Sequence, residues 1–292
     1  MPPLINAMII GVEKAGTTSL LRYLSQHPKI DSHEVMEMSF FTVDKEYARG
    51  YESAYKKYFK HHVKGNLLLA KSVGCIYYSK ALSRLHEHNP RMKLILILRN
   101  PVDRAYSAYL YACKMGREDS ESFEEAIQLE EKRRGTGDDF YIRYNSYLHR
   151  GLYSEQIVRL FYLFPRDQIK IILFEDFKEN PRRVVYELFD FLGVEPVEVD
   201  ISKKYNEGST SRSNFFLRVF LRNSLFSNVV RWFIPYEIRQ KIKLLIRENK
   251  NRAGATVQPM EKNTRKWLVE YYAHDIQKVE ELLGIDLSRW KI

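Results

Sequence analysis

The stretch Met8-Ile-Ile-Gly-Val-Glu-Lys-Ala-Gly-Thr-Thr-Ser-Leu-Leu-Arg-Tyr-Leu24 decides the fold of this chain. It opens with apolar residues typical of a short buried strand, passes through a glycine-containing turn, and continues with residues typical of a helix. Gly11 and Gly16 have the spacing of the phosphate-binding loop G-x-x-x-x-G-K-[ST], but Thr17 stands where that pattern has its lysine. The lysine of this loop is Lys14, between the two glycines. The stretch therefore predicts a phosphate-binding turn whose cation addresses a different part of its ligand.

Short apolar runs and amphipathic segments alternate along most of the remaining chain. The run Lys93–Leu98 shows no polar alternation, which is typical of a strand covered by helices on both faces of a parallel sheet. The pattern predicts an α/β fold of P-loop-like type, with a mostly parallel, doubly wound central sheet flanked by helices. We expect one domain over residues 1–292, with a helical C-terminal part from about residue 215 packed on it. The expected strands are 7–12, 67–70, 93–98 and 168–174, and the expected helices are 17–25, 81–88, 101–115, 122–134, 152–164, 181–192, 215–225, 236–248 and 261–283.

The charge balance points to an anionic partner. The formal net charge of the 292 residues is +10, which favours nucleotides, anionic substrates, nucleic acid or membrane surfaces. The basic residues are dispersed and no nucleic-acid-binding motif accompanies them, so we expect no nucleic-acid partner. The two cysteines, Cys75 and Cys113, lack the spacing of metal ligands, and we expect no metal site.

A second candidate anion site follows the clearest strand, in Leu98-Arg-Asn-Pro-Val-Asp-Arg-Ala-Tyr-Ser-Ala-Tyr109. Arg99 leaves the strand where a triphosphatase would offer an acid for magnesium, although Glu175 follows the strand expected at 168–174. Ser107 lies about two turns into the next helix, and both side chains can address one phosphate near the carboxyl edge of the sheet. Two separate phosphate sites indicate a donor with phosphates on two positions.

The two motifs, in this order, resemble the donor-binding motifs of PAPS-dependent sulfotransferases of the bacterial and heparan-sulfate types, where PAPS is 3′-phosphoadenosine 5′-phosphosulfate. The segment 205–213 resembles the later donor-closing loop of that family, and residues 268–290 resemble the C-terminal helix of its bacterial members. The resemblance implies a 5′-phosphosulfate site made by Lys14, Ala15, Gly16, Thr17, Thr18 and Ser19, and a 3′-phosphate site made by Arg99, Ser107 and Arg212.

The family's chemistry implies in-line transfer of a sulfuryl group from PAPS to a hydroxyl, or second to an amine, which leaves PAP. Such an enzyme is of the EC 2.8.2 type. Lys14 would stabilise the charge that develops on the leaving phosphate. No metal is required, because the sulfuryl group carries less charge than a γ-phosphoryl group.

The candidate general base is Glu37 in Val35-Met-Glu-Met-Ser-Phe-Phe41, which resembles the family's K-E-x-x-F-F stretch. Met36 replaces its lysine, and His33 and Glu34 are competing bases. Lys71, in a stretch similar to the family's E-K-[ST]-P, is expected to touch the sulfuryl group or the acceptor. Tyr153, in Arg150-Gly-Leu-Tyr153, is expected to border the acceptor cleft.

Several alternatives stay open. The chain can instead be a P-loop kinase-like phosphotransferase or a non-catalytic nucleotide-phosphate binding protein. The acceptor hydroxyl can belong to a small molecule, a glycan or a lipid-like compound. The apolar and basic stretch 232–246 is compatible with core packing, a homodimer contact or a membrane surface. No apolar run approaches the length of a membrane span, about 18 residues, and no signal peptide is evident; we expect a cytoplasmic protein, or else the catalytic domain of a Golgi-lumenal enzyme without its anchor.

Overall fold

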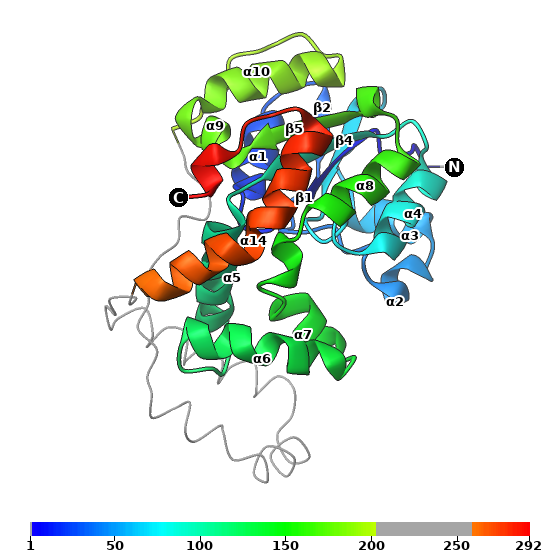
Figure 1. The fold of residues 1–292 in the computed structure, drawn as a ribbon. Coiled ribbons are helices and arrows are strands. Elements are labelled where there is room, and N and C mark those ends of the chain that lie inside the picture. Colours follow the sequence, from blue (N-terminus) through cyan, green and yellow to red (C-terminus); the bar gives the residue numbers. More distant parts are fainter. Residues whose placement is uncertain (1, 203–258) are drawn as a thin grey trace, which may run out of the picture. The chain divides into compact units, whose positions relative to one another are not determined.

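A five-stranded sheet is the core around which residues 1–105, 148–207 and 266–292 fold (Figure 1). The structure is a computed structural model that describes residues 2–202 and 259–292. The strands lie in the order β2-β3-β1-β4-β5, and every neighbouring pair is parallel. Their bounds are β1 Ala7–Gly11, β2 Ile30–Ser32, β3 Leu67–Lys71, β4 Lys93–Leu98 and β5 Ile169–Leu173.

The apolar runs of the sequence form strands that are buried in the sheet. All five residues of β1 are buried, and so are residues 94–98 of β4, because both strands are interior strands of a sheet covered by helices. Helix α1 packs against α10, and α4 packs against α8, so helices surround the sheet (Figure 1). The predicted α/β fold with a parallel central sheet is confirmed, whereas the short strand β2 was not predicted.

The described helices agree with the expected ones within a few residues at each end, and α2, α3, α7 and α9 are additions. Their bounds are α1 Thr17–Leu24, α2 Asp44–Tyr47, α3 Tyr51–Tyr58, α4 Ser79–His88, α5 Pro101–Lys114, α6 Phe123–Gly135, α7 Asp139–Tyr144, α8 Ser154–Leu163, α9 Phe174–Glu179, α10 Pro181–Leu192 and α14 Lys262–Leu283. Among these described helices, none has both the length and the apolar content that crossing a membrane requires. The helices expected at 215–225 and 236–248, the stretch 232–246 and Arg212 lie outside the described residues.

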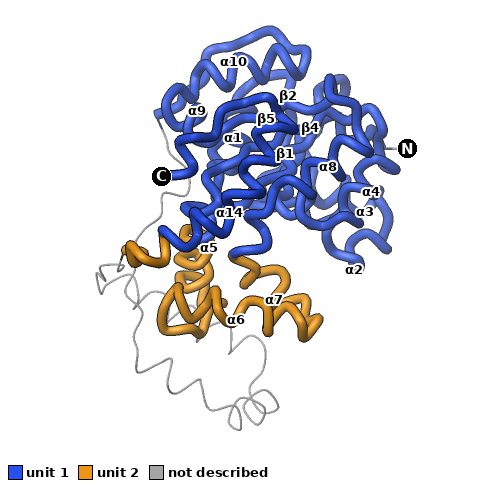
Figure 2. The backbone as a smooth tube through the Cα atoms, viewed as in Figure 1, with its two compact units in different colours: residues 1–105, 148–207, 266–292 blue, residues 106–147, 208–265 orange. Residues whose placement is uncertain are grey.

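The chain divides into two compact units (Figure 2). The first unit comprises residues 1–105, 148–207 and 266–292 and contains the whole sheet. The second comprises residues 106–147 and 208–265, and its described part contains α6 and α7. That the two units act as one sulfotransferase domain stays a prediction.

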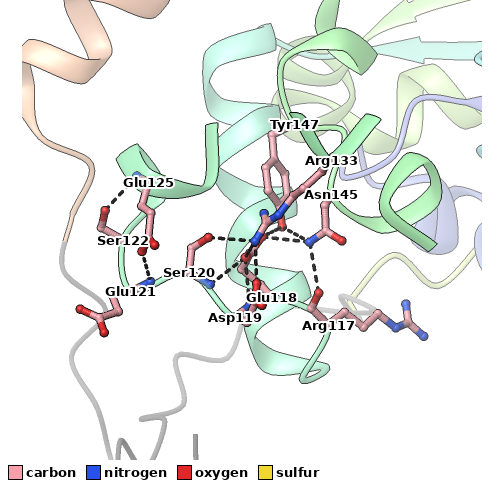
Figure 3. Close-up of polar contacts among 10 residues, drawn as sticks. All are labelled: Arg117, Glu118, Asp119, Ser120, Glu121, Ser122, Glu125, Arg133, Asn145 and Tyr147. Carbon is pink, nitrogen blue, oxygen red and sulfur yellow. Dashed lines mark hydrogen bonds and ion pairs between the residues drawn. The ribbon is translucent and has the colours of Figure 1, made fainter. Parts of the chain in front are cut away.

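A buried polar network organises the described part of the second unit (Figure 3). The Glu118 side chain is 0% exposed and accepts hydrogen bonds from both terminal nitrogens of Arg133, at 3.1 and 2.9 Å. The Tyr147 hydroxyl and the Asn145 amide also donate to Glu118 Oε2, at 2.5 and 2.9 Å. Burial alone would raise the pKa of Glu118, but the hydrogen bonds from Arg133, Tyr147 and the Ser120 backbone outweigh it and hold this pKa at about 2. The network ties the segment before α6 to α6 itself and to the segment after α7.

Candidate active site

The turn after β1 has the shape of an anion-binding loop. Gly11 tolerates no side chain, because a Cβ there would lie 2.5 Å from Cγ2 of Ile76. Gly16 has φ +77°, in the left-handed region that glycine adopts readily, and it immediately precedes α1. The N-cap residue of α1 is thus a glycine, which has no side chain that could cap the helix, and the positive end of the helix dipole favours an anion at this place. These features fit the 5′ end of a phosphosulfate donor.

Arg99 joins the end of β4 to this loop. Its Nη1 donates a hydrogen bond of 2.7 Å to the Lys14 carbonyl oxygen, and its guanidinium lies over the Phe174 ring, 4.8 Å from the centroid. Lys14 itself has φ 69°, an uncommon conformation for a residue with a side chain. Burial lowers the pKa of Arg99, yet the guanidinium stays charged at any physiological pH because its ordinary pKa is so high. The structure therefore brings together two of the predicted donor-binding residues.

The other predicted donor-binding residues are less closely defined. Ala15 and Thr17 are buried in the loop and the first turn of α1, and Thr18 accepts a hydrogen bond of 3.2 Å from Lys71 Nζ. Ser19 follows in the same turn. Ser107 is half-buried in α5 and belongs to the second compact unit, whereas Arg99 belongs to the first. A 3′-phosphate site shared by Arg99, Ser107 and Arg212 stays a prediction.

Glu37 and Lys71 form an ion pair next to the loop. Lys71 Nζ donates to Glu37 Oε1 at 2.5 Å, and the Val73 N–H donates to Glu37 Oε2 at 2.9 Å. The Lys71 side chain is 1% exposed and the Glu37 side chain 33% exposed, so solvent reaches only the acid. Burial raises the pKa of Glu37, and the nearby charge of Lys71 opposes this rise only in part. Glu37 and Lys71, two candidate catalytic residues 34 positions apart in the chain, are thus in direct contact. The same Lys71 ammonium group also contacts Thr18 in the first turn of α1.

His33, one of the competing bases, has both ring nitrogens engaged. Its Nε2 accepts a hydrogen bond from the Lys71 backbone N–H at 2.9 Å, so Nδ1 carries the proton and donates to the Val35 carbonyl oxygen at 2.8 Å. The side chain is fully buried, and this burial lowers its pKa to about 4. In this arrangement His33 has no lone pair left for the proton of an acceptor. Glu34 is exposed, and its backbone carbonyl accepts from Arg22.

Tyr153 lies beside the donor-binding residues. It is 1% exposed, and its hydroxyl donates a hydrogen bond of 2.9 Å to the Arg99 carbonyl oxygen. The contact relates Tyr153 to the end of β4, and its expected place at an acceptor cleft stays a prediction.

Sequence reasoning missed a second polar group next to the loop, made by Glu13 and Arg150. The two side chains form an ion pair at 3.8 Å, Arg150 Nη2 donates to the Tyr78 hydroxyl at 3.0 Å, and the guanidinium lies 4.4 Å from the centroid of the Tyr77 ring. The available signal was Arg150 at the head of the R-G-L-Y stretch. The group brings a cation and two aromatic rings close to the loop, and the Glu13 charge adds to the rise in the pKa of Glu37.

The chain is similar to known proteins in both sequence and fold. The sequence profile of the family described as "Sulfotransferase domain" matches residues 4–214. The chain is similar to heparan sulfate glucosamine 3-O-sulfotransferase 3B1 of Mus musculus, with 28% identity over 202 residues, which are 69% of this chain and 49% of that protein. It is also similar to bifunctional heparan sulfate N-deacetylase/N-sulfotransferase 3 of Mus musculus, with 28% identity over 97% of this chain but only 30% of that protein. A solved sulfotransferase from Alicyclobacillus acidocaldarius has a TM-score of 0.73 and 28% identity, and the match covers 100% of both chains.

Proposed function

Because the chain belongs to the sulfotransferase domain family, we propose that it transfers the sulfuryl group of PAPS to a hydroxyl, or second to an amine, of an acceptor. One observation carries the proposal. Lys71 contacts both Thr18 at the start of α1 and the carboxylate of Glu37. The turn predicted to bind phosphate, the buried Lys71 and a carboxylate with a raised pKa therefore meet at one place, which supports a transfer from a phosphate-bound donor to a neutral nucleophile.

Each residue has a proposed role. PAPS supplies an activated sulfuryl group, and the reaction leaves PAP. Glu37 takes the proton of the acceptor as the new oxygen–sulfur bond forms and the bond between sulfur and the bridging oxygen breaks. Lys14 stabilises the negative charge that appears on the leaving phosphate. Lys71, which contacts both Thr18 and Glu37, stabilises the oxygens of the sulfuryl group. The reaction requires no metal ion in this proposal.

The donor sites are assigned by the same reasoning. The 5′-phosphosulfate is held by the loop and the first turn of α1, and the 3′-phosphate is held by Arg99, with Ser107 and Arg212 as further contacts. The loop geometry supports the first assignment, because Gly16 has a left-handed conformation directly before α1 and the N-terminus of a helix favours an anion. The place of Arg99 directly after β4 supports the second, because ligands of open α/β sheets bind at the carboxyl ends of the strands.

For the acceptor we propose only a chemical class, a compound with a free hydroxyl group. The curated relatives are named for heparan sulfate, and the chain spans about half or less of their length. Glycan hydroxyls are therefore the first acceptors to test, followed by phenolic and lipid-like alcohols. We also propose that the protein is cytoplasmic and that it forms a homodimer.

The first test is calorimetric titration with PAP, beside ADP with magnesium. Wild-type protein should bind PAP, and Arg99→Ala should weaken this binding about 10- to 100-fold, the loss expected for hydrogen bonds to a charged group. Arg91→Ala, which changes an exposed arginine before β4, is the matched control and should bind as wild type.

Two outcomes would overturn the proposal. Binding of ADP with magnesium but not of PAP would move the chain to the kinase-like class. Binding of PAP without any transfer from ³⁵S-labelled PAPS to heparan sulfate, N-desulfated heparan sulfate, 4-nitrophenol or a long-chain alcohol, and without release of sulfate to water, would indicate a non-catalytic binding protein.

A further inference from the structure

The segment 33–39 contacts Lys71 at three places: its backbone N–H, its backbone carbonyl and its side chain. The Lys71 N–H donates to His33 Nε2 at 2.9 Å, and its carbonyl accepts from the Met38 N–H at 2.8 Å. Its ammonium group meets Glu37. Both backbone groups and the side chain of one residue at the end of β3 are therefore held by a single segment. One of these partners is the backbone N–H of Met38, whereas the other two are the side chains of His33 and Glu37.

Aromatic residues fix the position of the His33 ring. The ring packs edge-on against Tyr58 and Phe59, with centroids 5.9 and 6.5 Å apart. The Tyr58 hydroxyl accepts from the Ser39 N–H at 3.1 Å and donates to Glu46 Oε2 at 2.8 Å. The residues at the end of α3 thus contact both ends of the segment that carries Glu37. The imidazole has little freedom to turn, and only its Nδ1–H tautomer satisfies both neighbours.

We propose that His33 is a positioning residue of the transfer reaction, which aligns Lys71 with Glu37 by accepting the Lys71 backbone N–H. The inference rests on the function proposed above, because it assigns His33 a part in the same site. His33 touches no reacting atom and takes no proton. Its effect reaches the reaction through the direction of the Lys71 side chain and through the path of the segment from Val35 to Met38.

Two substitutions separate this role from simple space filling. Glutamine places a terminal amide oxygen near the position of Nε2 and can still accept from the Lys71 N–H, whereas the shorter asparagine reaches only the Val35 side of the ring. His33→Gln should therefore preserve the alignment, and His33→Asn should remove it. His274→Asn, which changes an exposed histidine of α14, is the matched control for introducing asparagine.

The first measurement is the rate of hydrogen exchange at the Lys71 backbone amide, monitored by NMR on the whole chain. Exchange should accelerate about tenfold in His33→Asn, as expected when one hydrogen bond is lost, and should stay at the wild-type rate in His33→Gln and His274→Asn. Unchanged exchange in His33→Asn would overturn the inference, whatever reaction the protein catalyses.

The second measurement is the turnover of ³⁵S-labelled PAPS, to an acceptor that wild-type protein sulfates or else to water. For His33→Asn we expect kcat to fall about 10- to 100-fold, the effect of a misplacement near 1 Å, with the Kd for PAP unchanged and with rescue in His33→Gln. The acid limb of kcat should also move to higher pH in His33→Asn. Lys71 and the Val73 N–H lower the pKa of Glu37 and Glu13 raises it, so a Lys71 that has moved away lowers this pKa less.

The outcomes distinguish the two proposals. A wild-type protein that binds no PAP or turns over no PAPS contradicts the proposed function, while the exchange rate of Lys71 still tests the contact. An active wild type with wild-type kcat in His33→Asn contradicts the positioning role. Equal losses in His33→Gln and His33→Asn, or a loss of PAP affinity that parallels kcat, would show that the ring only fills space.

Discussion

At Glu37, burial and charge act on the same carboxylate in opposite directions. Burial raises its pKa above the ordinary value of 4.5, and Lys71 and the Val73 N–H lower it by a smaller amount. A base works best when its pKa approaches the pH of the reaction. The raised pKa therefore makes Glu37 a stronger base than an exposed glutamate, while a third of its side chain stays accessible to an acceptor.

We predict that Glu37→Gln lowers kcat by about 10²- to 10⁴-fold, the usual contribution of a general base, and leaves the Kd for PAP unchanged. In the wild type, kcat should fall as the pH drops through the raised pKa of Glu37, because the base must be deprotonated. This acid limb should lie above pH 4.5, the ordinary value for the group, and should vanish from the residual activity of the variant. Glu34→Gln is the neighbouring control, and an equal loss of kcat there would move the base to Glu34.

At the scale of elements, α14 and α8 support the end of β4. Asp275 of α14 accepts hydrogen bonds from the N–H groups of Tyr153 and Ser154, at 2.7 and 3.2 Å, and from the Ser154 hydroxyl at 2.5 Å. A carboxylate at this position stabilises the start of α8, whose dipole is positive there. The Tyr153 hydroxyl then reaches the Arg99 carbonyl. The C-terminal helix is thereby connected to the residue assigned to the 3′-phosphate.

We expect Tyr153→Phe to weaken PAP binding about 3- to 10-fold, because it removes one hydrogen bond and leaves the Arg99 carbonyl without that donor. Calorimetric titration with PAP measures the effect directly. Tyr162→Phe, in the helix α8 that follows Tyr153 and with Tyr162 88% exposed, is the matched control and should bind as wild type. Unchanged PAP affinity in Tyr153→Phe would restrict Tyr153 to core packing.

The elements that the sequence predicted to the residue are those whose ends carry clear signals. Strand β4 and helix α10 have the predicted bounds, because an unbroken apolar run and a Pro–Gly pair at the two helix ends leave little choice. Strand β2 was missed because it has three residues, of which Asp31 and Ser32 are polar. Its pairing with β3 supplies the stability that its composition does not show.

The candidate site could be proposed from the sequence as a set of residues but not as a geometry. Motifs and their resemblance to a family are local features, so they singled out Lys14, Arg99, Glu37 and Lys71 as candidates without stating which of them touch. The contact between Glu37 and Lys71 depends on where the segment after β2 crosses the end of β3, which is a property of the folded sheet. The same holds for His33, whose role as hydrogen-bond acceptor appears only when the Lys71 backbone is in place.

At the scale of the whole molecule, the resistance to acid depends on buried carboxylates. Glu118 has a folded-state pKa of about 2, below the value of about 4.3 in an unfolded chain. A group whose pKa is depressed on folding stabilises the protein above its unfolded pKa, and this contribution is lost as the pH falls through the folded pKa. The window for Glu118 thus runs from about pH 4 to pH 2.

We predict that Glu118→Gln lowers the free energy of unfolding by about 3 kcal/mol at pH 7, because it leaves the buried Arg133 without its main counter-charge. Thermal unfolding followed by circular dichroism at a series of pH values measures the difference. The gap between wild type and variant should be constant from pH 7 to about pH 5 and then close as the pH approaches 2, since protonation of Glu118 makes the wild type resemble the variant. Glu131→Gln, on the exposed side of α6, should unfold as wild type throughout. A gap that persists unchanged at low pH would mean that Glu118 stabilises the protein through the shape of its side chain and not through its charge.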